Sequence, residues 1–210
     1  MRFRRLLAGA VVAALAAGAV AIRADEPARQ DAPASSAAPT GSSIYNIESK
    51  WTNQDGANVA LASLSGKPVV AAMGYTTCKG ICPAIVADMM WIEKHLPKGD
   101  ADRVRFAFFS FDSEADTPER LRLYAESHGL DLGHWSLLRA DEDATRELAA
   151  ALGVAYRPDG AGGFDHAAVI SLLNAKGEIV FQQTGTRASC DELLVRLKAQ
   201  LEARAQHPPR

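Results

Sequence analysis

Apolar residues gather into short uninterrupted runs from residue 67 onward, and amphipathic stretches separate these runs. Apolar runs of this length, bounded by turn residues, are typical of strands that are buried on both faces. Strands are therefore expected at residues 67–75, 104–111 and 167–174. A fourth strand is expected at residues 177–185, paired with the third through the turn Ala175-Lys176-Gly177.

The amphipathic stretches carry signals for the starts of helices. Helices are expected at residues 83–96, after Thr117, after Asp141 and after Ser189. Proline fits the first helical turn, and the oxygen of Ser, Thr or Asp accepts a hydrogen bond from the free N–H groups at a helix start. Ser189 and Glu192 also have the spacing of a capping box.

The order strand, helix, strand, helix, helix, hairpin and helix predicts an α/β fold with a thioredoxin-like topology. We expect its peroxiredoxin-like variant, a three-layer α/β/α sandwich with the sheet covered on both faces. Residues 45–51 and 58–61 would form an added N-terminal hairpin. One domain is thus expected over residues 44–206.

Residues before this domain have a different character. Three arginines near the N-terminus precede an uncharged apolar run at residues 6–22, which is typical of an export signal. Cleavage after Ala21 and retention as a membrane anchor both remain open, because the run is barely long enough to span a bilayer. Residues 1–21 are therefore expected to be a signal peptide or anchor, and the Pro-, Ala- and Ser-rich residues 22–43 a disordered linker. The domain would lie on the periplasmic side, either soluble or tethered to the cytoplasmic membrane.

Composition and charge narrow the range of functions. The chain has 210 residues, of which 48% are hydrophobic and 23% charged, as in an ordinary globular protein. Its 23 basic and 25 acidic side chains give a formal net charge of −2. Without a basic excess, a nucleic-acid partner is not favoured.

Cys78 and Cys82 form a CxxxC pair that follows a predicted strand and opens a predicted helix. The free N–H groups and the partial positive charge at a helix start favour thiolate, which is the form that attacks disulfides and binds metals. A stapling disulfide is the plain alternative, but closing so short a loop stabilises a fold little. Metal binding and disulfide chemistry both remain open from the cysteines alone.

His166 follows the glycine-rich residues 160–163 and precedes the third predicted strand. A lone histidine in a loop is commonly a surface residue, but a thioredoxin-like topology brings this loop beside the cysteine turn. Two thiolates and one imidazole suit Cu(I), whereas Zn(II) would favour a fourth ligand. Residues 159–173 contain no proline, so the cis-proline of thioredoxins has no counterpart there.

Three separate stretches resemble the Sco/SenC family of copper proteins that are needed for cytochrome c oxidase assembly. They are GYTTCKGICP, SFDSEADTPERL and DHAAVISLLNAKGEIV, and the resemblance covers about residues 44–200. It implies that Cys78, Cys82 and His166 ligate copper, as Cu(I) or Cu(II), and that Asp165 orients or tunes the site. Two positions depart from the family pattern. Lys79 stands where the family commonly has Pro, and Asp112-Ser113 stands where the family usually has an Asp-Pro pair.

By this resemblance the protein is a metallochaperone that delivers copper to the dinuclear copper site of a respiratory cytochrome c oxidase. The implied partners are the copper-accepting oxidase subunit and, in addition, another periplasmic copper chaperone or a thiol reductase. Membrane contact would come through an uncleaved N-terminus. The alternative is a thiol-disulfide reductase that keeps oxidase cysteines reduced, with Cys78 and Cys82 as a redox-active disulfide when oxidised. A thiol peroxidase is not favoured, because no general base accompanies the motif.

Several other residues invite attention but are expected to have structural roles. Cys190 is expected to be a small half-buried residue, and Met89 and Met90 to fill the core. The remaining residues are expected to lie in the core or rim (Trp51, Trp91, Trp135), at the surface (His95, His128, His134) or in a solvated turn (Asp112, Glu114, Asp116).

Overall fold

The computed structural model of the protein describes residues 41–186 and 190–206. These residues all belong to one unit of the chain, residues 33–210. The expected signal peptide or anchor and the linker up to residue 40 lie outside the described residues. Within the described part, no helix combines the length and the apolar character needed to cross a membrane.

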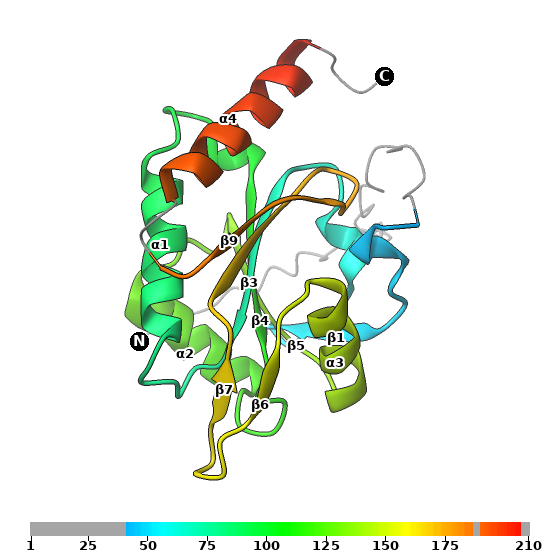
Figure 1. Ribbon diagram of the computed structural model, residues 1–210, viewed down its shortest axis with the longest axis vertical. Helices are drawn as coiled ribbons and strands as arrows, with labels where there is room; N and C mark the ends of the chain where they lie inside the picture. Colours follow the sequence, from blue (N-terminus) through cyan, green and yellow to red (C-terminus); the bar gives the residue numbers. More distant parts are fainter. Residues whose placement is uncertain (1–40, 187–189, 207–210) are drawn as a thin grey trace, which may run out of the picture. The chain divides into compact units, whose positions relative to one another are not determined.

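A seven-stranded mixed sheet is the central layer of this unit (Figure 1). Its strands are β1 (Lys50–Asn53), β2 (Asn58–Ala60), β3 (Val69–Gly74), β4 (Arg105–Ser110), β5 (Trp135–Arg139), β8 (Val169–Leu173) and β9 (Ile179–Thr184). They lie in the order β2-β1-β5-β4-β3-β8-β9, with β3, β4 and β5 parallel. Every residue of β3 and β8 is buried, and every residue of β4 except the first is buried. The long apolar runs of the sequence therefore form the centre of the sheet, as predicted.

Helices cover both faces of the sheet (Figure 1). They are α1 (Cys82–Lys94), α2 (Pro118–His128), α3 (Glu142–Ala151) and α4 (Cys190–Gln206). Successive strand residues point to opposite faces, so Val70 packs in the core that α1, α2 and α4 share, whereas Val69 packs in the other core. The second core is closed by α3 and by two short 3₁₀ helices at Ile44–Asn46 and Leu61–Leu64. This arrangement confirms the predicted three-layer α/β fold.

Three details differ from the prediction. Residues 135–139 form β5, which was not expected because the strand is short and only three of its five residues are buried. Residues 45–46 belong to a 3₁₀ helix, and the first strand of the N-terminal hairpin begins only at Lys50. A separate two-stranded sheet, β6 (Tyr156–Pro158) with β7 (Phe164–His166), precedes β8. His166 thus ends β7 and does not begin the next strand.

Two helix caps confirm the predicted starts. The Thr117 side chain accepts a hydrogen bond from the Arg120 N–H, and Asp141 accepts one from the Ala144 N–H. Ser189 lies outside the described residues, so its capping box stays a prediction. By contrast α1 has no side-chain cap, because Ile81 stands at its N-cap. The Cys82 N–H at its start instead donates a hydrogen bond to Cys78.

Candidate metal centre

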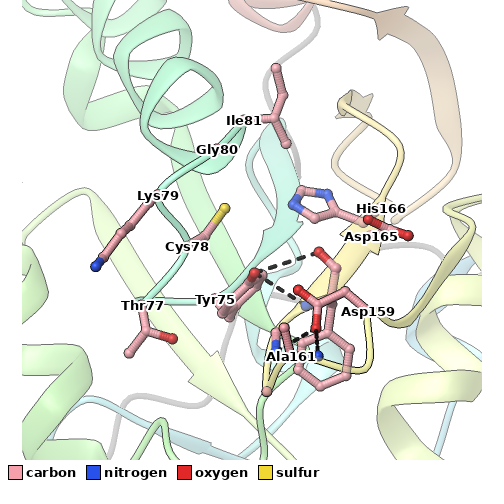
Figure 2. A pocket seen from close by; sticks show the side chains of 13 residues that line it. Tyr75, Thr77, Cys78, Lys79, Gly80, Ile81, Asp159, Ala161, Asp165 and His166 are labelled. Carbon is pink, nitrogen blue, oxygen red and sulfur yellow. Dashed lines mark hydrogen bonds between the residues drawn. The ribbon is translucent and has the colours of Figure 1, made fainter.

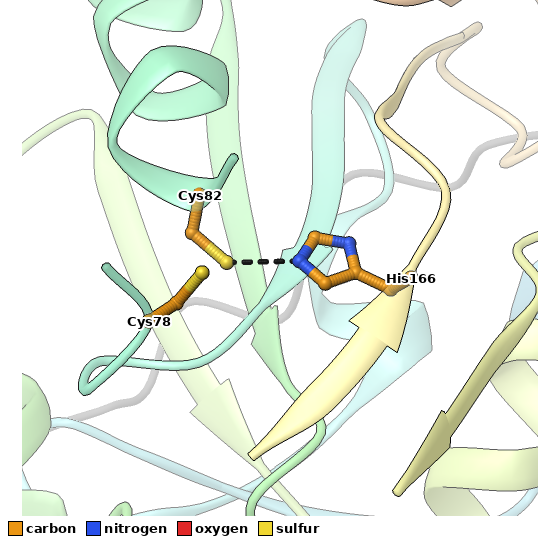
Figure 3. A group of neighbouring side chains, drawn as sticks. All are labelled: Cys78, Cys82 and His166. Carbon is orange, nitrogen blue, oxygen red and sulfur yellow. Dashed lines mark hydrogen bonds between the residues drawn. The ribbon is translucent and has the colours of Figure 1, made fainter. Parts of the chain in front are cut away.

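Two distant parts of the sequence meet at one end of the sheet. β3 ends at Gly74, the loop 75–81 carries Cys78, and Cys82 is the first residue of α1. His166, from β7, reaches the same point from the opposite side (Figure 3). Their three ligand atoms, two Sγ and one imidazole nitrogen, all lie within 4.8 Å of one another. The structure therefore brings together the two cysteines and the histidine that the sequence singled out.

The histidine is held in the orientation that a metal ligand needs. Its Nε2 lies 3.0 Å from Cys82 Sγ, and its Nδ1 lies 3.1 Å from the Ala167 carbonyl oxygen. An Nδ1–H that donates to this carbonyl leaves the Nε2 lone pair free to face the sulfurs. Burial also lowers the pKa of His166, with the Ala167 carbonyl opposing it in part. The imidazole is therefore neutral near pH 7, the state that binds metals.

The two thiols have unlike surroundings. Burial would raise the pKa of Cys78, but hydrogen bonds from the Cys82 side chain and from the Cys82 and Gly80 backbone outweigh it and bring this pKa below its ordinary value. Burial raises the pKa of Cys82 far above its ordinary value, and the neighbouring Cys78 adds to the rise. Both cysteines are free thiols in the structure. Cys78 is thus the more easily deprotonated thiol of the pair, and Cys82 is the buried thiol behind it.

Glycines let the backbone come close to both sides of the site. A Cβ added at Gly74 would lie 3.0 Å from Cys82 Sγ and 2.9 Å from the Phe108 ring. A Cβ at Gly163 would lie 2.7 Å from the Tyr75 hydroxyl oxygen. Real Cβ atoms do not approach other atoms so closely, so Gly74 requires glycine for reasons of space. A side chain at Gly163 would require the Tyr75 hydroxyl to shift.

A family model described as SCO1/SenC matches residues 38–202 of the chain. The chain belongs to the SCO1/SenC family. This result confirms the resemblance drawn from the three sequence stretches, and the fold agrees with it.

Relatives of this Sco/SenC chain include proteins of known structure. It is 30% identical over 145 residues to the SCO1 protein homolog of Bacillus subtilis, a match that covers 67% of this chain and 75% of the relative. Bradyrhizobium japonicum ScoI, solved with copper bound, is 29% identical with a TM-score of 0.59, covering 72% and 96% of the two chains. BsSco, a Sco family cytochrome c oxidase assembly protein in which a disulfide switch was identified, is 27% identical with a TM-score of 0.64, covering 73% and 92%.

A cleft of about 480 Å³ opens beside Cys78 in this Sco/SenC domain (Figure 2). Lys79 stands on its cysteine side, and Asp159 and Asp165 on its histidine side. Asp165 is exposed and pairs with Arg157 at 3.2 Å. The contact that orients the His166 ring comes from the Ala167 carbonyl, so the orienting role expected of Asp165 stays a prediction.

Two aromatic rings lie beside His166, and no sequence pattern predicted them. The Phe111 ring lies 5.1 Å from the imidazole and the Tyr75 ring 6.3 Å from it, measured between centroids. The Tyr75 hydroxyl accepts a hydrogen bond of 3.2 Å from the Phe164 N–H, which joins the cysteine loop to β7. The two rings come from two separate segments, so only the tertiary fold reveals that they meet at His166.

One surface prediction was wrong, and one surface histidine has partners that were not predicted. Asp116 is fully buried rather than solvated, and its carboxylate bonds to the cysteine loop. His134 has carboxylates on both ring nitrogens, Glu93 at 3.1 Å and Asp102 at 3.0 Å. The hydrogen bond to Asp102 raises the pKa of His134, burial opposes the rise, and Glu93 adds to it. Both residues acquire their partners across the fold, at sequence distances that no local pattern shows.

The predictions for three core residues were confirmed. Met89, Trp51 and Trp135 are fully buried in the two cores. Cys190 is more buried than expected, and the Gln183 side chain lies 3.5 Å from its sulfur. It lies outside the group formed by the other two cysteines and the histidine.

Proposed function

We propose that Cys78, Cys82 and His166 bind a single copper ion, which the protein delivers to the dinuclear copper site of a cytochrome c oxidase during its assembly. The observation that carries the proposal is the clustering of two thiols and one neutral imidazole within 4.8 Å. Thiolate sulfur and imidazole nitrogen are ligands that copper prefers. In the described part of the chain this group has three members, which suits Cu(I) better than four-coordinate Zn(II).

The arrangement also favours release of the ion. Cys78 is only half-buried and lines the open cleft, whereas Cys82 is buried behind it. An acceptor thiol or imidazole that enters the cleft could add to the three-coordinate ion before Cys78 leaves. Transfer would then proceed by exchange of ligands, without a free copper ion at any stage.

Family membership supports the proposed role. Copper-bound structures are known for the Sco proteins of Bradyrhizobium japonicum, Arabidopsis thaliana and yeast. The proposed acceptor is the copper-accepting subunit of the oxidase. An export signal or anchor within residues 1–21 would place the domain on the periplasmic side, where such a subunit presents its copper site. A second periplasmic copper chaperone or a thiol reductase would supply copper or electrons.

A second candidate function is reduction of oxidase cysteines by the Cys78–Cys82 pair. The unequal thiols favour it, because a thiolate at the cleft can attack a disulfide and a buried thiol can then resolve the mixed disulfide. Two electrons would pass from the pair to the target, leaving a Cys78–Cys82 disulfide that needs an external thiol reductant. The disulfide switch identified in BsSco supports this chemistry in a relative.

Copper retention by the purified, reduced protein tests the proposal. After dialysis against a competing chelator we expect one copper per chain, and a sharp loss in Cys78→Ser and His166→Ala. Cys190→Ser is the matched control, since it removes a thiol that lies outside the group. Copper lost equally from all three variants, or none in the wild type, would contradict the proposal. In the second case, a reversible Cys78–Cys82 disulfide would favour the reductase.

A further inference from the structure

Asp116 is a buried carboxylate that is not one of the proposed copper ligands. It stands between the turn 112–116 and the start of α2, and none of its surface is exposed. No salt bridge to it is formed within the described residues. Burial of a charged group is unfavourable unless hydrogen bonds replace its lost water.

Three neutral donors supply those hydrogen bonds. Asp116 Oδ2 accepts from the Thr76 N–H at 3.0 Å and from the Ser110 hydroxyl at 2.5 Å. Asp116 Oδ1 accepts from the Thr76 hydroxyl at 2.5 Å. Ser110 ends β4 in register with Gly74, the last residue of β3. The carboxylate therefore fastens the first residues after β3 to the end of the neighbouring strand.

The fastened segment carries one of the proposed copper ligands. Thr76 stands two positions before Cys78, the half-buried ligand on the loop, and directly after Tyr75. The Tyr75 hydroxyl in turn accepts the Phe164 N–H, two positions before His166. Asp116 thus holds Thr76, and the neighbouring Tyr75 bonds to β7. Together these contacts hold the loop that carries Cys78 next to the strand that carries His166.

A purely local role does not account for these bonds. The turn has its own side-chain contact, because Asp112 accepts from the Ala115 N–H. Helix α2 has its own cap, because Thr117 accepts from the Arg120 N–H. Asp116 instead directs both carboxylate oxygens away from its own segment, toward a loop 40 positions earlier in the chain.

We propose that Asp116 is a positioning residue for the metal centre: by holding Thr76 it fixes the loop in the conformation that keeps Cys78 Sγ within reach of Cys82 Sγ and His166 Nε2. This inference rests on the proposed function and adds a residue to its site. Without the carboxylate, three donors lose their acceptor and the loop must reorganise before it binds copper. Partners that orient ligands in this way typically contribute about 10–100-fold to metal affinity.

Copper affinity of the full-length protein distinguishes positioning from mere stabilisation. For Asp116→Ala we expect copper binding about 10–100-fold weaker than in the wild type. Asp116→Asn keeps the shape and one acceptor oxygen, so it should recover part of the affinity. Asp141→Ala is the matched control, because it removes a carboxylate that caps α3 away from the site. It should lower thermal stability and leave copper affinity unchanged.

An effect of the Asp116 charge and an effect of loop position would change the copper affinity of Asp116→Ala in opposite directions. Loss of a negative charge near the thiols favours thiolate and would strengthen copper binding, whereas a loosened loop weakens it. Binding by Asp116→Ala that equals or exceeds that of the wild type would overturn the proposal. An equal loss in Asp141→Ala would overturn it as well, because the effect would then follow stability alone.

A second readout separates this inference from the proposed function. The equilibrium between the Cys78–Cys82 dithiol and its disulfide, measured against glutathione, needs no copper. Closing a disulfide across the first turn requires the loop to give way, so Asp116→Ala should shift this equilibrium toward the disulfide. If the wild type fails to retain copper, the proposed function fails while this shift still supports the positioning role. An unshifted equilibrium in Asp116→Ala would contradict that role.

Discussion

Cys82 Sγ and His166 Nε2 lie 3.0 Å apart although 84 positions separate the two residues in the chain. The contact joins the first residue of α1 to the last residue of β7. The sheet, the glycines and the aromatic rings around the site all pack close to these two side chains.

Gly74 should not tolerate a side chain. Gly74→Ala places a Cβ within 3.0 Å of both the Phe108 ring and Cys82 Sγ, so the protein should lose about 1–3 kcal/mol of unfolding free energy. Urea unfolding measures this loss. Gly80→Ala is the matched control in the same region, since its Cβ would meet only Cys78 Sγ, at 4.0 Å. Equal stability of the two variants would show that the packing against Gly74 is not tight.

Tyr75 should contribute to copper affinity through its hydroxyl group. Tyr75→Phe removes the acceptor for the Phe164 N–H, which should weaken the hold on β7 by about 1 kcal/mol and copper binding by up to about fivefold. A competition titration with a chelator measures the change. Tyr45→Phe is the control, because the buried Tyr45 hydroxyl has no hydrogen-bond partner among the described residues. Copper binding that is weakened in Tyr45→Phe but not in Tyr75→Phe would contradict the role given to the Tyr75 hydroxyl.

The two thiols should react at different rates. Cys78 is half-exposed with a lowered pKa, whereas Cys82 is buried with a raised pKa. In the metal-free protein at pH 7, iodoacetamide should therefore modify Cys78 several times faster than Cys82. Peptide mapping by mass spectrometry at short reaction times measures both. Faster modification of Cys82 would reverse the roles assigned to them.

His134 should make stability depend on pH. Its pKa is raised in the folded state, so its stabilising effect is complete below the unfolded pKa of about 6.5 and is lost as the pH rises through the folded value. The effect should amount to about 1 kcal/mol or less. Urea unfolding of the wild type and of His134→Gln between pH 5.5 and about pH 9 measures the difference.

The comparison with the variant is necessary because His166 acts in the opposite direction. The pKa of His166 is lowered, so its contribution to stability decreases as the pH falls. Subtracting the two curves removes this common part and leaves the contribution of His134. A difference that does not shrink as the pH rises would contradict the ion pairs seen with Glu93 and Asp102.

The sequence predicted the central strands and the helix starts because their signals are local. Uninterrupted apolar runs and capping residues identified β3, β4, β8 and the starts of α2 and α3. The strand β5 was missed because its five residues include polar Ser136 and Arg139, and the pair β6–β7 because each has only three residues. Short strands acquire most of their stability from neighbours, which a local pattern does not contain.

The candidate site was predicted from spacing, topology and family resemblance together. The cysteines could be found from their position between a strand and a helix, but His166 needed the fold to bring it near. Asp116 could not be recognised, because an acidic residue in a turn is commonly solvated and its donors lie 6 and 40 positions away. The residues that support a site are thus harder to predict than the ligands themselves.

X-ray absorption spectroscopy of the copper-loaded, reduced protein reports the copper ligands themselves. We expect two sulfur ligands and one imidazole nitrogen on Cu(I), with the nitrogen lost in His166→Ala and one sulfur lost in Cys78→Ser. A spectrum of oxygen and nitrogen ligands without sulfur, or one unchanged in both variants, would contradict the assignment of Cys78, Cys82 and His166 as the copper site.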